Sequence, residues 1–156
     1  MRRYAILALR ALIGLVFVYA AWTKLRDPWT LFAMSVDSYH LLSENGVIFV
    51  ARTLPWFELA LGIAVLSGIA LRYSSIAAAA LLGGFFTVMA IEYAHGAQID
   101  CGCFGPGEAL GPVSLLRDGT LVALAIALAI LAFARRPASS ETGASSRDAC
   151  GAEAAH

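Results

Sequence analysis

Residues 74–93 read SSIAAAALLGGFFTVMAIEY, a run of 20 residues in which Glu92 is the only charged side chain. A helix needs roughly 20 mostly apolar residues, within a range of about 17–25, to cross the hydrocarbon core of a bilayer. Three more stretches meet this requirement, so the candidate spans are residues 4–23, 55–71, 74–93 and 114–134. The sequence therefore predicts an all-α integral membrane protein that folds as an up-down four-helix bundle.

The composition indicates that the lipid bilayer is the solvent for most of the chain. Hydrophobic residues make up 60% of the 156 residues, charged residues make up 14%, and the mean hydropathy is +0.74. Soluble domains are about 25% charged. The formal net charge is zero, so we expect the bilayer itself, and no nucleic acid, as a partner.

The chain is long enough for one domain, and its last residues differ from the rest. We expect residues 1–136 to form the four-span membrane domain. Residues 137–156 are rich in Ala, Ser, Gly, Glu and Asp, which predicts a disordered cytoplasmic tail. The first apolar run is expected to stay in the mature protein, because Trp22-Thr23-Lys24 does not resemble a small-residue cleavage site.

The distribution of Lys and Arg predicts the orientation in the membrane. With the N-terminus in the cytoplasm, seven of the eleven basic residues fall on the inner side and four on the outer side. Both termini are then cytoplasmic. We expect a multi-pass protein of the bacterial inner membrane, in which the loop between the third and fourth spans faces the periplasm or the cell exterior.

Several local features follow from turn and capping rules. Pro55 suits the first turn of the second span, which would place Glu58 in that turn as well. The short segment 72–75 would join the second and third spans as a hairpin, and Gly83-Gly84 would allow close helix packing. The connection 24–54 is aromatic and amphipathic, as expected for a segment at the membrane interface.

Each span carries ionisable residues near its predicted outer end, and an antiparallel bundle brings these ends to one level. Charged residues at membrane depth are candidates for function. The structural alternatives are that Lys24 is an interfacial anchor and that Glu58 pairs with Lys24 or Arg117. The residues at this level are Lys24, Arg26, Asp27, Glu58, Glu92, His95, Arg117 and Asp118.

The outer loop contains the sequence Cys101-Gly102-Cys103-Phe104-Gly105. Two thiols separated by one glycine can close a small, strained disulfide, and strained disulfides tend to be the exchangeable ones. His95 or Arg117 would favour the thiolate if either lies nearby. No predicted span contains a cysteine, so we do not expect electrons to cross the bilayer through cysteines; quinone and a soluble thioredoxin-like protein are the candidate redox partners.

Two other interpretations of the same residues remain open. Cys101 and Cys103, together with His95 and Asp100, would suit a soft metal ion bound or transported by the protein. Alternatively, the protein is a non-enzymatic assembly factor, and the disulfide only stabilises its loop. Cys150, in the predicted tail, is expected to be inert.

Taken together, these features resemble the DoxX-like membrane proteins, and in particular the methylamine-utilisation MauE family. The motifs that carry the resemblance are Lys24-Leu25-Arg26-Asp27, Pro55-Trp56-Phe57-Glu58-Leu59-Ala60-Leu61-Gly62, and Asp100-Cys101-Gly102-Cys103-Phe104-Gly105 followed by Arg117-Asp118. The resemblance covers about residues 4–134.

The resemblance implies a four-helix membrane protein linked to periplasmic thiol chemistry. MauE-like proteins are associated with the maturation of methylamine dehydrogenase and with a thioredoxin-like periplasmic partner. Carried over to this chain, Cys101 and Cys103 are the redox pair of a thiol-disulfide oxidoreductase. Lys24, Glu58 and Arg117 form a polar core, and His95 is a further candidate for tuning the thiols.

Overall fold

The computed structural model describes residues 2–96 and 110–134, which form five helices and no strand. Four of the helices are long and apolar enough to cross a membrane. The helices are α1 (Arg2–Arg26), α2 (Trp29–Asp37), α3 (Glu44–Ser67), α4 (Leu71–Ala94) and α5 (Pro112–Phe133). The prediction of an all-α bundle with four spans is confirmed, and α2 is a short additional helix in the connection that was predicted to lie at the interface.

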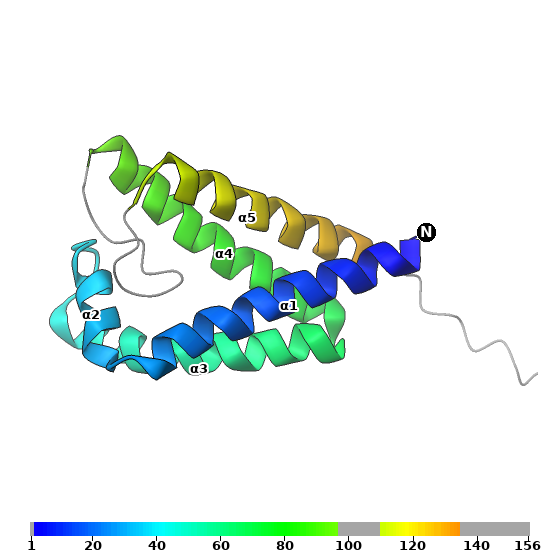
Figure 1. Ribbon diagram of the computed structural model, residues 1–156, viewed down its shortest axis with the longest axis horizontal. Helices are drawn as coiled ribbons and strands as arrows, with labels where there is room; N and C mark the ends of the chain where they lie inside the picture. The colour runs from blue at the N-terminus through cyan, green and yellow to red at the C-terminus, as the bar shows by residue number, and fades with distance from the viewer. Residues whose placement is uncertain (1, 97–109, 135–156) are drawn as a thin grey trace, which may run out of the picture.

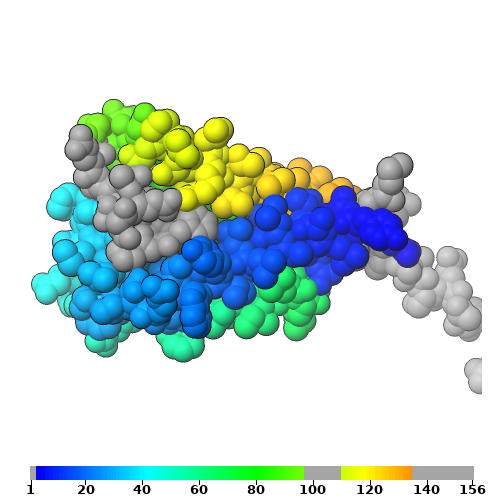
Figure 2. All heavy atoms as spheres, viewed as in Figure 1, coloured from blue at the N-terminus to red at the C-terminus, as the bar shows by residue number. Residues whose placement is uncertain are grey.

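The four long helices alternate in direction and pack as two antiparallel pairs (Figure 1). One pair is α1 with α3, and the other is α4 with α5. The pairs lie close together near the N-terminus of α1 and diverge toward the opposite end, where α2 packs on α3 (Figure 1). In the space-filling view, α1 runs along this face between α5 and α3 (Figure 2).

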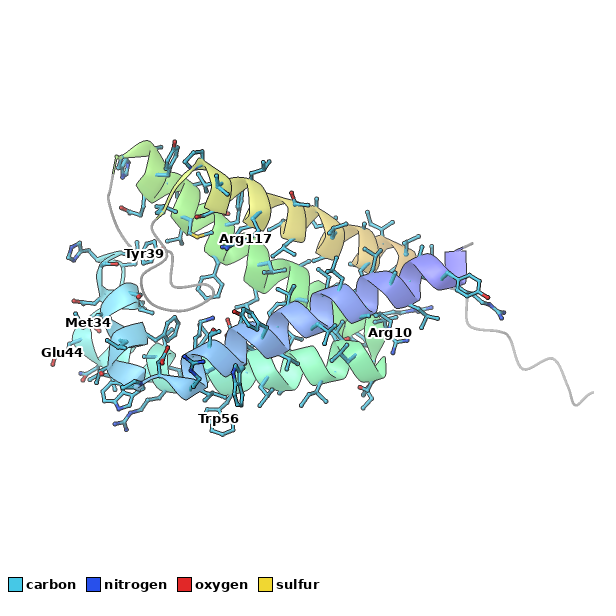
Figure 3. All side chains as sticks on the ribbon, viewed as in Figure 1. Arg10, Met34, Tyr39, Glu44, Trp56 and Arg117 are labelled. Carbon is cyan, nitrogen blue, oxygen red and sulfur yellow. The ribbon has the colours of Figure 1, made fainter. Side chains whose placement is uncertain are left out.

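The outer faces of the bundle carry many large apolar side chains. The buried core includes Ile13 and Val65, while Leu15, Trp56 and Ile130 are exposed. Trp56 projects outward from α3 in Figure 3. A helix that is hydrophobic all round needs an apolar surrounding on its outer face, which a bilayer provides.

Two glycines allow the backbones of α1 and α3 to approach closely. A Cβ atom on Gly62 would lie 3.0 Å from the carbonyl oxygen of Gly14 and 3.0 Å from Cγ2 of Val18. Small residues at a helix crossing permit such packing in membranes. The glycines of α4 do not have this role, because a Cβ atom on Gly83 or Gly84 would have no contact within 4 Å. The prediction of close packing at Gly83-Gly84 is therefore wrong.

Arg10 links α1 to the C-terminal end of α3. Its Nε donates a hydrogen bond to the carbonyl oxygen of Val65 at 3.2 Å, and its Nη2 donates one to that of Leu66 at 2.7 Å. These carbonyls belong to the last turn of α3, where the helix dipole favours a cation, and the Val65 carbonyl also accepts a hydrogen bond from the Gly68 N–H at 3.2 Å. Gly68 then ends the helix with φ of 75°, a left-handed conformation that glycine adopts without strain.

The second span begins and ends earlier than predicted. α3 starts at Glu44 and continues through Pro55, which is buried in the helix interior. Membrane helices tolerate an internal proline. Glu58 therefore lies well inside α3 rather than in its first turn. The hairpin to α4 is formed by residues 68–70, and Arg72 belongs to α4.

The close crossing of α1 and α3 predicts a specific sensitivity at Gly62. The variant Gly62→Leu is expected to destabilise the bundle by about 1–3 kcal/mol, because the added side chain meets backbone that cannot yield without separating the helices. Unfolding in detergent, followed by far-UV circular dichroism, measures the loss. The matched control is Gly83→Leu, which adds the same side chain where there is open space. Equal stability of the two variants would contradict the packing described here.

Candidate functional site

A buried ion pair joins the two helices of the first pair. The Lys24 Nζ lies 3.0 Å from Oε1 and 2.9 Å from Oε2 of Glu58, so the ammonium group donates to both carboxylate oxygens. The exposed fractions of the two residues are 5% and 3%. The interpretation that Glu58 pairs with Lys24 is confirmed. The two charged groups are buried together, in direct contact with each other.

The direction of helical side chains explains how these two residues meet. Side chains lean toward the N-terminus of their own helix. Lys24, close to the end of α1, therefore leans back along α1, while Glu58 leans toward the start of the antiparallel α3. Phe32 of α2 makes a cation–π contact with the pair, since its ring centroid lies 5.2 Å from the Lys24 Nζ.

A second pair lies near the start of α5. Arg117 Nε donates to Oδ1 of Asp118 at 2.9 Å, and Arg117 Nη2 donates to Oδ2 at 3.3 Å. Asp118 is buried, whereas Arg117 is partly exposed. Arg117 and Arg10 lie toward opposite ends of the bundle in Figure 3. The two ion pairs, Lys24–Glu58 and Arg117–Asp118, thus lie at the end of the bundle where α1 and α4 finish and α3 and α5 begin.

A cavity of about 400 Å³ lies between the two helix pairs at this end. Its polar lining includes Lys24, Glu58 and Asp118. The expected convergence of ionisable residues is therefore observed for these three. Five aromatic side chains also line the cavity, namely Phe17, Phe32, Tyr39, Phe85 and Phe86.

The aromatic lining was not among the residues that the sequence identified as functional. Phe32 and Tyr39 come from the connection whose aromatic character was noted, but that pattern predicted only a position at the interface. Phe85 and Phe86 lie in an apolar run where a lining role carries no sequence signal. The divergence of the helix pairs makes these residues part of a cavity.

His95 does not join this cluster among the described residues. It is the C-terminal cap of α4, it is exposed, and it is not among the residues that line the cavity. No group of three or more His, Cys, Asp or Glu residues gathers within residues 2–96 and 110–134 in a way that would hold a metal ion.

The cysteine motif lies outside the described residues. Cys101, Cys103 and Asp100 belong to the segment 97–109, which joins the end of α4 to the start of α5. The predicted tail, 137–156, also lies outside. The redox and metal interpretations of Cys101 and Cys103 therefore stay predictions.

Breaking the buried ion pair on one side is expected to cost more than removing it whole. Lys24→Met leaves the Glu58 carboxylate buried without its counter-charge, and we expect a loss of about 3–5 kcal/mol in the free energy of unfolding. The double variant Lys24→Met, Glu58→Leu is expected to lose clearly less. Detergent unfolding followed by circular dichroism compares them, with Arg26→Met as a control because Arg26 is an exposed cation in the same turn of α1. A double variant that loses as much stability as Lys24→Met would contradict the interpretation that the unpaired Glu58 carboxylate causes the loss.

Comparison with known proteins gives a family for this chain. A family model described as "Methylamine utilisation protein MauE" matches residues 2–132. Methylamine utilization protein MauE from Paracoccus denitrificans is 38% identical over 140 residues, which cover 88% of this chain and 75% of the relative.

The protein of the same name from Paracoccus versutus is 33% identical over 133 residues, which cover 83% of this chain and 71% of the relative. No solved structure matches the chain. The wider DoxX-like resemblance stays a prediction. The match over nearly the whole described part, together with the four apolar helices, shows that the chain belongs to the MauE family.

Proposed function

We propose that this chain is a membrane accessory protein of methylamine utilisation that exchanges disulfides with proteins outside the cytoplasm. Cys101 and Cys103 are the reacting pair. The observation that carries the proposal is membership of the MauE family by a chain that holds a Cys-Gly-Cys motif in its α4–α5 connection. The names of the relatives support the metabolic context, and the spacing of the thiols supports the chemistry.

The order of the helices supports an outward position for this connection. Four alternating spans put the start of α1 and the end of α5 at one end of the bundle, and the end of α4 and the start of α5 at the other (Figure 1). The excess of Lys and Arg on the side of the termini favours the cytoplasm for that side. In the bacterial inner membrane, the cysteine-bearing connection would then face the periplasm, where disulfides persist.

The proposed reaction is a two-electron exchange with a thioredoxin-like periplasmic partner. A partner thiolate attacks the Cys101–Cys103 disulfide and forms a mixed disulfide, and one cysteine of the pair leaves as a thiolate. The second partner thiolate resolves the mixed disulfide. The partner is left oxidised and Cys101 and Cys103 are left reduced, so that two electrons have moved onto this chain.

The charged residues of the described part support this chemistry in different ways. The Lys24–Glu58 pair holds α1 against α3 at the same end of the bundle as the connection. Arg117 is partly exposed at the start of α5, and His95 is exposed at the end of α4. The two residues flank the connection, His95 at the end of α4 and Arg117 in the second turn of α5, and a nearby cation favours a thiolate.

The client of such an exchange would be an enzyme of methylamine oxidation that needs disulfides for its maturation. Methylamine dehydrogenase is the client that the family resemblance suggests. The chain would not itself oxidise the amine, since its role is to pass oxidising equivalents to the maturing enzyme through the thioredoxin-like partner.

Acid quenching and alkylation with a mass tag in intact cells test the redox role. A Cys150→Ser variant leaves Cys101 and Cys103 as the only thiols of the chain. The pair is expected to be oxidised at steady state, to become reduced after a pulse of reductant, and to reoxidise when the reductant is removed. A shift of two mass tags distinguishes the forms.

Three results would contradict the proposal. Thiols that never oxidise would exclude exchange, and thiols that become protected only when copper or zinc is added would favour the metal interpretation. A disulfide that resists the reductant pulse would indicate a purely structural disulfide in an assembly factor.

A further inference from the structure

The cavity between the helix pairs has the size and lining of a ligand site. Binding sites for small molecules are mostly apolar, with a few polar groups, and measure about 300–1,000 Å³. This cavity of about 400 Å³ has apolar side chains over most of its wall, and its lining includes Leu41, Leu42, Ala80 and Gly84, which are exposed. The cavity can therefore be reached from the surface of the described part of the molecule.

The polar groups in the lining are unusual for a site that would hold only hydrocarbon. Lys24 and Glu58 carry opposite charges in direct contact, and Asp118 is also buried. An acyl chain offers no polar atom to these residues. A ligand with oxygens on an apolar ring can add to the contacts that these residues already make, because a carbonyl oxygen accepts a hydrogen bond from an ammonium group, and the hydroxyl formed when it is reduced donates one to a carboxylate.

We propose that this cavity binds the ring of a lipid-soluble quinone, the class of molecule that accepts two electrons within a bilayer. Its ring would lie among the aromatic side chains Phe17, Phe32, Tyr39, Phe85 and Phe86, which offer stacked and edge-to-face contacts. In the quinone form a carbonyl oxygen would accept a hydrogen bond from Lys24, and in the hydroquinone form a hydroxyl would donate one to Glu58 or Asp118. The apolar tail of such a molecule would extend out of the cavity past its exposed lining residues.

This inference rests on the proposed thiol exchange for its role in the cell. Each exchange leaves Cys101 and Cys103 reduced, and a second turnover requires that two electrons leave the pair. In the balanced step, the two S–H bonds break and one S–S bond forms. Two electrons and two protons reach the two carbonyl oxygens of the quinone, which becomes a hydroquinone with two O–H bonds.

Glycine positions in α4 provide a matched pair of variants for testing the cavity. Gly84 lines the cavity, whereas its neighbour Gly83 does not. An added Cβ atom at either position would meet nothing within 4 Å, so both positions should accept a larger side chain. Gly84→Phe would place a ring in the cavity, and Gly83→Phe adds the same ring outside it.

The probe is a photoreactive benzoquinone with a decyl tail, applied to the full-length protein in lipid nanodiscs. Labelled peptides are identified by mass spectrometry, and occupancy is titrated against a non-photoreactive decyl benzoquinone. Saturable labelling of cavity residues is expected in the wild-type protein and in Gly83→Phe. For Gly84→Phe we expect at least about tenfold weaker labelling, since the ring occupies the site.

The outcomes separate the ligand from other occupants. Equal labelling of Gly84→Phe and wild-type protein would overturn the proposal, as would labelling that does not saturate. Decylbenzene carries the same tail without carbonyl oxygens, and if it competes as well as the quinone, the cavity holds an acyl chain instead. Unfolding curves in detergent verify that the two phenylalanine variants are folded to the same extent.

The test also separates this inference from the proposed function. The Cys101→Ser, Cys103→Ser variant is expected to bind the probe as the wild-type protein does, because the proposal places the ring and its oxygens on side chains of the described helices and of the α2–α3 connection. Cysteines that cycle in cells while Gly84→Phe labels normally would leave thiol exchange intact and remove the quinone site. Normal probe binding together with cysteines that never oxidise would support the quinone site and exclude thiol exchange.

Discussion

The buried ion pair between Lys24 and Glu58 determines how the first half of the molecule is arranged. Either charge alone at membrane depth is costly, by several kcal/mol on insertion scales. Each residue therefore requires the other, and they belong to different helices. Their contact combines with the glycine crossing at Gly14 and Gly62 and with the Arg10 cap to fix α1 against α3 at three levels.

A consequence of this arrangement is that the bundle behaves as two pairs rather than four equivalent helices. The Lys24–Glu58 pair, the Arg10 hydrogen bonds and the glycine crossing all join α1 to α3, and α4 packs mainly on α5. A bilayer supplies no hydrophobic force that would press the pairs together, because lipid tails are as apolar as leucine. The pairs can therefore diverge at one end, and the cavity lies in that space.

The sequence predicts those features that depend on composition over a whole span. Four apolar runs of sufficient length identify the spans, and the cost of a charge in lipid makes Lys24 and Arg117 the candidate partners of Glu58 before any geometry is known. The start of α3 was predicted wrongly, because a rule about proline at helix starts was applied to Pro55. The apolar residues before Pro55 continue the helix, and the membrane tolerates the missing hydrogen bond. The cavity was missed because phenylalanines in an apolar span carry no signal that separates lining from lipid-facing positions.

The ion pair also determines what kind of ligand the cavity accepts. An unpaired lysine or glutamate would attract an ion or water into the bundle, whereas a contact pair presents little net charge to an approaching molecule. Aromatic walls then favour a neutral, flat and apolar molecule. Lys24, Glu58 and Asp118 keep the partners described above, and a ligand that hydrogen-bonds to them as well gains contacts that hydrocarbon cannot make. A neutral ring with oxygens at its edge can make both the aromatic and the polar contacts, and hydrocarbon can make only apolar ones.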